Sequence, residues 1–395
     1  MTIIVMHIFW AGFYLFFPVL VLYLCHTYSV FEKLGAAAIC FLVGMVLANI
    51  GIIPDGIKNT QSIIMTITVP LAIPLMLFPT DLRRWIKLAG KSLLSFVLII
   101  FSVMAATTIG YVLLQNRVDE AAKIGGMFVG GFTGATVNFM GVAMALKTTS
   151  ETIVLTTASS WLLEIFWLLF IMFLGQRIIG KFLPRFTFSP TAEPIDTAET
   201  NEAYEREKID LMSYQGIFTR KKFIRMLGAL GTAMIIFAVG AGLYSITPEI
   251  YNMTVLMLSV STLGILCSFV PAIRKIEMSF QLGQYIILIF CITIASTVDF
   301  SELLNASLAI LGYTCIALVG MSLIHILLCK IFKIDTDTQI ITATAGIFSP
   351  IFVPMVASSL KNTDIIVPGL AAGIIGYAIG NYLGISFSYL LMALS

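Results

Sequence analysis

Residues 125–141 read GGMFVGGFTGATVNFMG, and six of these seventeen residues are glycine. The segment is apolar enough for a membrane, yet each glycine costs an α-helix up to about 1 kcal/mol relative to alanine. Residues 342–354 read TATAGIFSPIFVP, in which Pro350 and Pro354 prevent an unbroken ladder of helical hydrogen bonds. Irregular backbone at membrane depth persists only where protein covers it or where it lines a water-filled cavity. The two segments therefore predict broken or re-entrant helices beside a binding site.

The rest of the chain is just as apolar. Of its 395 residues, 59% are hydrophobic and only 11% are charged, whereas a soluble domain carries about a quarter charged residues. Only helices and closed barrels satisfy their backbone in lipid, and the alternating ten-residue pattern of a barrel is absent from the sequence. The composition predicts an all-α polytopic membrane protein whose surroundings are the lipid bilayer. A net charge of +2 gives no reason to expect nucleic acid as a partner.

Twelve apolar segments can be delimited. They cover approximately residues 3–25, 33–53, 61–79, 89–115, 122–147, 153–181, 223–247, 252–272, 281–298, 304–329, 338–360 and 365–393. A polar stretch with three prolines and charges of both signs separates the first six from the last six, and its composition predicts a cytosolic linker. We therefore divide the chain into a first membrane repeat (residues 1–182), a linker (residues 183–222) and a second membrane repeat (residues 223–395).

The two halves match at one offset of about 215 residues, which indicates an internal repeat. Residues 145–151 read ALKTTSE after the fifth segment, and residues 359–364 read SLKNTD after the eleventh. Gly131 and Gly346 occupy corresponding places within these two segments. Asp81 and Asp299 likewise follow the third and ninth segments.

Charge predicts the topology of this repeat, because Lys and Arg are enriched in cytoplasmic loops. All the clearly basic loops fall on one side if the fifth and eleventh segments each enter and leave the membrane on that side. Each half then has about five crossings and one re-entrant segment. Since five is an odd number, the halves are inverted relative to each other, as is common in secondary transporters. We expect a bacterial-type cytoplasmic (inner) membrane, with linker 183–222 in the cytosol.

The two irregular segments supply the candidate substrate site. Broken helices expose N–H groups that suit an anion and C=O groups that suit a sodium ion, and hydroxyl and amide side chains add neutral ligands. The candidate substrate-binding residues are Gly130, Gly131, Thr133, Gly134, Thr136, Asn138, Thr344, Gly346, Ser349 and, in the last span, Asn381. The alternative is that the glycines only allow close helix packing.

Glu164 lies in the middle of the sixth span, where an ionisable group costs at least a few kcal/mol unless it is paired or solvated. It is interpreted either as a coupling site for sodium or a proton, or as a protonated carboxyl that ties helices together. The candidate ion-coupling residues are Glu164, Asn138, Thr157 and Ser160, although Ser and Thr commonly bond to their own helix. No nucleotide-binding, zinc or nucleophile motif occurs. We therefore expect no enzyme activity, no cofactor, and no metal beyond a sodium site.

The Pro70–Leu75 run before Asp81, the Gly130–Asn138 run and the long linker resemble the uncharacterised YjcL-type family of integral membrane proteins over nearly the whole chain. That family is similar to the cation–anion transporter superfamily, which includes sodium/glutamate and bile-acid symporters. The resemblance implies a scaffold domain and a moving transport domain, with Gly-rich elements meeting near the membrane midplane. The second half departs from this pattern, because one glycine and two prolines stand where a second Gly-rich loop is expected.

Together these features predict a sodium- or proton-coupled symporter of a small organic anion such as an amino acid, a carboxylate or a short acidic peptide. Spans four, six, ten and twelve with the two irregular segments would form the transport core. The remaining spans would form the scaffold, which in such folds often makes a homodimer. The alternatives are a membrane-embedded binding or structural protein without transport, and a membrane enzyme on a lipid-linked substrate. The enzyme requires Glu164 and the lone intramembrane His325 to meet.

Overall fold

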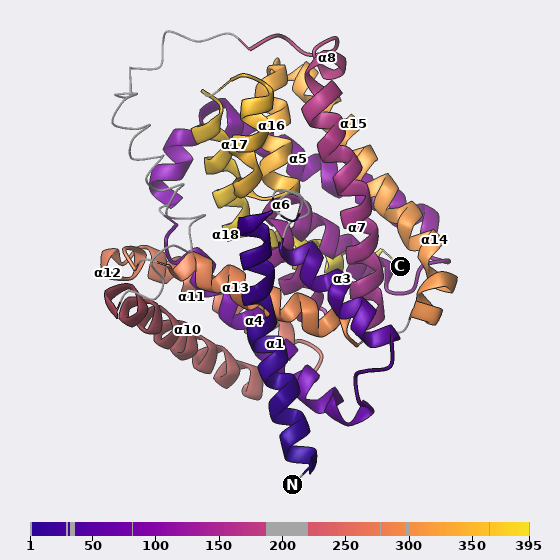
Figure 1. Ribbon diagram of the computed structural model, residues 1–395. Coiled ribbons are helices and arrows are strands. Elements are labelled where there is room, and N and C mark those ends of the chain that lie inside the picture. The colour runs from indigo at the N-terminus through magenta and orange to yellow at the C-terminus, as the bar shows by residue number, and fades with distance from the viewer. Residues whose placement is uncertain are drawn as a thin grey trace.

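The computed structural model describes residues 2–28, 31, 36–80, 82–186, 220–276, 278–297, 300–362 and 364–394, and every regular element in this part is helical (Figure 1). The elements of the first half are α1 (Thr2–Thr27), α3 (Ala36–Asn49), η1 (Asp55–Ile57), α4 (Lys58–Leu77), α5 (Leu82–Leu114), α6 (Ala121–Ala145), α7 (Ser150–Phe170), η2 (Ile171–Gly175) and α8 (Gln176–Ile179). Those of the second half are α10 (Arg220–Ile246), α11 (Asn252–Ser268), α12 (Pro271–Arg274), α13 (Ser279–Ala295), α14 (Phe300–Cys315), η3 (Ile316–Gly320), α15 (Met321–Ile331), α16 (Thr336–Ile347), η4 (Pro350–Phe352), α17 (Val353–Ser359) and α18 (Ile366–Ala393).

Eight helices among the described residues are long and apolar enough to cross a membrane. Large apolar side chains such as Phe16, Phe173 and Ile246 point outward, as lipid-facing residues do. The protein is therefore an integral membrane protein, and the all-α prediction is confirmed, with helix found in each of the twelve apolar segments. The inverted relation between the halves stays a prediction. Most of the predicted linker, residues 187–219, lies outside the described residues.

Helix α6 folds back on itself and forms what we call hairpin 1 (residues 120–149). Its backbone leaves helical geometry at Gly134 (φ −136°, ψ 24°) and Ala135 (φ 55°, ψ −167°). At the root, the Glu120 carboxylate accepts hydrogen bonds from the backbone N–H of Thr149 (3.0 Å) and from its hydroxyl (2.9 Å). The two ends of the segment therefore lie side by side. Helix α6 is one of the eight long apolar helices counted above, but the kink divides it. Each half is about 15–20 Å long at about 1.5 Å per residue, which is too short to cross a hydrocarbon core of about 30 Å.

The segment from α16 to α17 makes a second hairpin, which we call hairpin 2 (residues 335–362). Asp335 caps the start of α16, and its carboxylate accepts a hydrogen bond from the backbone N–H of Thr338 (2.8 Å). The chain breaks after Ile347, and Ser349 has a φ of 115°. At the root, the Asn362 amide donates to the Asp337 carboxylate over 2.8 Å, so the two ends of this segment are also adjacent.

The Glu120 carboxylate, where the two ends of hairpin 1 meet, is expected to make the stability of the protein depend on pH. Burial raises the pKa of this carboxyl, but hydrogen bonds from Lys123, Thr149 and Thr152 more than offset that effect, so its pKa is lowered. Because the pKa of Glu120 is lower in the folded protein than in the unfolded chain, its ionised carboxylate stabilises the fold at pH values above the ordinary pKa of Glu. This contribution to stability is lost as the pH falls through the pKa that Glu120 has in the folded protein. We expect Glu120→Gln to reduce stability at neutral pH by roughly 1–2 kcal/mol and to flatten the loss of stability in acid. Thermal unfolding in detergent at neutral and acidic pH measures both effects. An equal loss of stability on acidification in the wild-type protein and in Glu120→Gln would contradict the prediction.

The helices pack into two groups that meet along one interface. Helices α5, α6, α7 and α14 to α18 make their most extensive contacts with one another and form the core group. Helices α1, α3, α4, α10, α11 and α13 do the same and form the scaffold group. The division coincides with the core and scaffold that the family resemblance implies.

Hairpin 1 is held in the core group by α18, through glycines spaced four residues apart on both helices. The facing pairs are Gly126 and Gly384, Gly130 and Gly380, and Gly134 and Gly376. A Cβ atom added at Gly126 would lie 2.6 Å from the carbonyl oxygen of Gly384, so only glycine permits this approach. At these positions the structure shows close helix packing, which was the alternative interpretation of the glycines.

Candidate functional site

A cavity of about 350 Å³ lies between the core group and the scaffold group, and we call it the main cavity. Its size is within the range of small-molecule sites. Both chain breaks open onto it, since Ala135 and Thr136 of hairpin 1 and Phe348 and Ser349 of hairpin 2 are part of its wall. The scaffold side contributes residues of α1, α3, α4 and α13. Two irregular segments from separate halves of the chain thus meet at one space.

A second, much smaller cavity of about 20 Å³, the side cavity, adjoins the first. Five residues line both cavities and so mark the wall between them: Ala135, Thr136, Trp161, Glu164 and Ile347. The side cavity is further lined by the polar residues Thr157 and Ser160 of α7. A space of this volume holds about one water molecule or one small ion.

Glu164 is the only carboxylate among the described residues that line either cavity, and its side chain is partly exposed. The Ser160 hydroxyl faces this carboxylate from one helical turn earlier but forms no hydrogen bond of normal geometry within the described chain. The Thr156 hydroxyl, one further turn back, is also buried without such a partner. Thr157 donates to the Ile153 carbonyl over 2.6 Å, which leaves the lone pairs of its oxygen available as a ligand. The face of α7 toward the cavities is therefore rich in oxygen ligands.

Both chain breaks contain a residue with positive φ that is not glycine. Ala135 combines φ 55° with ψ −167°, close to a region that essentially only glycine adopts, and Ser349 has φ 115°. Such residues cost about 1–3 kcal/mol each and persist where the surrounding structure holds them, often at functional sites. The strain is consistent with a binding role for the breaks.

Ala135 allows a direct test of this strain. We expect Ala135→Gly to stabilise the protein by about 1 kcal/mol, because relief of about 1–3 kcal/mol of strain exceeds the entropic cost of a glycine. Ala143→Gly, at a buried helical position of the same hairpin, should instead destabilise by about 1 kcal/mol. Thermal unfolding of both variants in detergent measures the difference, and a loss of stability in both would show that Ala135 is not strained.

The structure places six of the predicted site residues on the cavities. Thr136, Ser349 and Glu164 line the main cavity, and Gly131, Thr157 and Ser160 join Thr136 and Glu164 around the side cavity. These residues come from hairpin 1, hairpin 2 and α7, which are far apart in the sequence.

The other predicted residues lie nearby but outside both walls. Thr133 and Thr344 donate to carbonyls one turn back in their own helices, and Gly130 and Gly134 pack against α18. Gly346 allows hairpin 2 to pack directly against hairpin 1. A Cβ atom added at this position would lie only 2.7 Å from the carbonyl oxygen of Phe132. The roles predicted for these residues in binding stay predictions.

The two asparagines have structural partners. Asn138 donates from its side-chain amide to the carbonyls of Gly134 (3.1 Å), Gly376 (3.2 Å) and Tyr377 (3.1 Å). It thereby satisfies a carbonyl at the break and fastens hairpin 1 to α18. Asn381 donates to the Ser261 hydroxyl (3.0 Å) and so connects α18 with α11 of the scaffold group. Neither side chain lines the main cavity or the side cavity.

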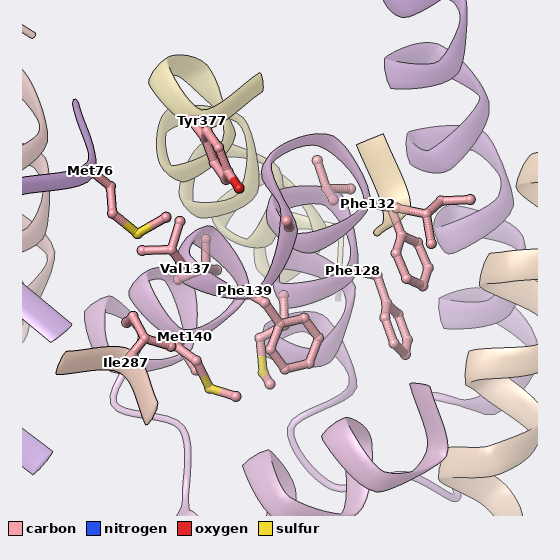
Figure 2. Close-up of a cluster of buried hydrophobic side chains, with 14 of the residues drawn as sticks. Met76, Phe128, Phe132, Val137, Phe139, Met140, Ile287 and Tyr377 are labelled. Atoms are coloured by element: carbon pink, nitrogen blue, oxygen red, sulfur yellow. The ribbon is translucent and has the colours of Figure 1, made fainter. Parts of the chain in front are cut away.

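Sequence reasoning missed the residues that the scaffold group contributes to the site, and it missed Tyr377 of α18. Met76, Gln284, Ile287 and Tyr377 line the main cavity from ordinary apolar spans. Figure 2 shows Met76 and Ile287 on the Val137 side of hairpin 1, and Phe128 and Phe132 on its other side. The Tyr377 hydroxyl lies close to the Ser349 side chain at the second break. Only Gln284, a polar residue within an apolar span, carried a signal in the sequence.

His325 belongs to a different buried cluster. Its Nε2 faces the carbonyl oxygen of Ser95 (3.0 Å), and its Nδ1 faces the amide of Gln339 (3.2 Å). The Ser95 hydroxyl in turn contacts the Thr342 hydroxyl (2.6 Å). The cluster joins α5, α15 and hairpin 2, and His325 lines neither cavity.

Two comparisons with known proteins place the chain. A family model described as "Protein of unknown function (DUF819)" matches residues 17–394. The chain is also similar to the "Uncharacterized membrane protein YjcL" of Bacillus subtilis (strain 168), with 22% identity over 367 residues that cover 89% of each chain. The predicted resemblance to a YjcL-type family is therefore confirmed, whereas the likeness to sodium symporters stays a prediction.

Proposed function

The chain belongs to the DUF819 family, and we propose that it is a secondary active transporter which couples sodium or a proton to the movement of a small organic anion. The anion would be an amino acid, a carboxylate or a short acidic peptide. The observation that supports this most strongly is the meeting of two broken hairpins, one from each half of the chain, at a cavity with Glu164 in its wall. Broken helices around a central site are typical of secondary transporters.

The anion would bind where the second half of α6 begins. The first N–H groups of a helix lack intrahelical partners and favour negative charge. Thr136 lies at this helix start and lines both cavities, while Ser349 at the other break and Tyr377 of α18 bring hydroxyl groups to the main cavity. These groups would orient a carboxylate without adding a net charge.

The coupling ion would occupy the side cavity. Glu164, Ser160 and Thr157 bring oxygen atoms to this space from α7, and oxygen atoms are the ligands that a small hard cation prefers. An ionised Glu164 repels an anion in the main cavity, and its neutralisation by a cation or a proton removes that repulsion. Because Glu164 belongs to both walls, one ion would favour the binding of one anion, and this linkage would couple their transport.

Alternating access would come from movement of the core group against the scaffold group. The interface between them carries hydrogen bonds that such a movement would exchange, including Asn381 to Ser261 (3.0 Å) and Thr262 with Tyr382 (2.7 Å). The proposal includes inverted repeats, a bacterial-type cytoplasmic membrane, a cytosolic linker, and a homodimer formed through the scaffold group.

Uptake into liposomes tests the function. Purified protein is reconstituted, and accumulation of a pool of radiolabelled carboxylates and amino acids is followed across an imposed sodium or proton gradient. Accumulation that stops when an ionophore collapses the gradient is the expected result. Solute binding without any accumulation would favour a membrane-embedded binding protein. Chemical conversion of a lipid-linked substrate would favour an enzyme, although His325 and Glu164 do not share a cavity wall.

A further inference from the structure

The main cavity has a polar end and an apolar end. Its polar end is the wall that it shares with the side cavity, where Thr136 and Glu164 lie. Met76, Ile287 and Leu288 line the main cavity from the scaffold side and do not belong to that shared wall, and Gln284 is the one polar residue among the described residues of the scaffold group that line it. A solute that fills this space exposes polar atoms to the hairpin breaks and carbon atoms to the scaffold group.

The charges in the wall limit the charge of the solute. Among the described residues that line either cavity there is one carboxylate, Glu164, and no Lys, Arg or His. Once the coupling cation has neutralised Glu164, the start of the second half of α6 provides partial positive charge for one anionic group. A second anionic group would have to enter the apolar end without a partner, and desolvation of an unpaired charge is costly.

We propose that the transported solute is an organic monoanion with an apolar body, that is, a branched-chain or aromatic monocarboxylate. Its carboxylate lies at the hairpin breaks near Thr136, and its hydrocarbon part contacts Met76, Ile287 and Leu288. This inference rests on the proposed function and narrows it, because dicarboxylates and acidic peptides are excluded as good substrates.

A panel of matched probes, in saturating sodium at mildly acidic pH so that either coupling ion is supplied, tests the inference through binding to the purified protein and uptake into liposomes. The probes are 4-methylpentanoate, the dicarboxylate glutarate, the amino acid leucine and the amine 4-methylpentylamine. We expect 4-methylpentanoate to bind at least about tenfold more tightly than each of the others, a difference of about 1.4 kcal/mol. Tighter binding of glutarate, leucine or the amine would overturn the monoanion assignment. If none of the four binds, the assignment also fails, while gradient-driven uptake of another solute would leave the proposed function standing.

Gln284 offers a gain-of-function test of the charge argument. Its side chain lines the main cavity from α13 of the scaffold group. Gln284→Lys adds the missing cation and should raise the affinity for glutarate relative to 4-methylpentanoate by about tenfold or more. Gln284→Met, which has a similar size and no charge, is the control and should leave this preference unchanged. An unchanged preference in a folded Gln284→Lys protein would contradict the inference. If Gln284→Lys does not fold, the binding of the four probes to the wild-type protein decides whether the inference holds.

Discussion

Replacement of Glu164 by glutamine is expected to abolish the dependence of anion binding and uptake on sodium and on pH. Glutamine is neutral and similar in size, so it mimics the carboxylate after a cation or a proton has bound. In the wild-type protein the coupling ion should tighten anion binding by about 5- to 150-fold, the usual range for coupling between two sites. In the variant this ratio should fall to about one. Exchange of labelled for unlabelled anion should persist, whereas accumulation against a gradient should be lost.

The matched control for this prediction is Glu151→Gln, which removes an exposed carboxylate from the first turn of the same helix, α7. That variant should keep full ion dependence. Isothermal titration with the anion, with and without sodium and at several pH values, measures the ratio in each protein. Unchanged coupling in Glu164→Gln would remove this residue from the ion site and support its alternative role as a carboxyl that ties helices together.

Replacement of Gly376 by alanine is expected to cause the largest loss of stability among the single changes considered. A Cβ atom at this position would collide with the backbone carbonyl oxygen of Thr133, which cannot move without displacing hairpin 1. Overpacking of this kind costs about 1–3 kcal/mol and more where backbone has to shift. The variant should therefore unfold at a clearly lower temperature in detergent. It should also lose anion binding, because the break at Ala135 moves with the hairpin.

Gly242→Ala is the control for this change. Gly242 lies in α10, and an added Cβ would meet no atom within 4 Å. There alanine should be neutral or should stabilise the helix by up to about 1 kcal/mol through its higher helix propensity. Equal melting temperatures for Gly376→Ala and Gly242→Ala would show that α6 and α18 are not packed as closely as described.

The sequence allowed prediction of those features that depend on local chemistry. Six glycines in residues 125–141 and the prolines after Ser349 predicted the breaks, because glycine weakens a helix and proline interrupts it. Glu164 was identified because a carboxyl is rare in an apolar span. The structure places all three of these features around one cavity.

The remaining features depend on which residues meet in space. Gly131 and Gly134 look alike in the sequence, yet one lines the side cavity and the other packs against α18. Asn138 was predicted as a ligand, but its amide is used by three backbone carbonyls, two of them in a helix more than two hundred residues away. Met76 and Tyr377 could not be identified, since they become part of the site only when the scaffold group and α18 close around the hairpins.

The most direct test of the account is the water accessibility of the two chain breaks. Cysteine is introduced at Thr136 or at Ser349 after the six native cysteines are replaced, and a membrane-impermeant maleimide is applied to reconstituted protein. Leu323→Cys on the outward face of α15 is the lipid-facing control, and Glu249→Cys is the exposed control. We predict labelling at both breaks, protection by the transported anion together with its coupling ion, and no labelling at position 323. Labelling at position 249 alone would mean that the breaks face no aqueous cavity, and this would contradict the account.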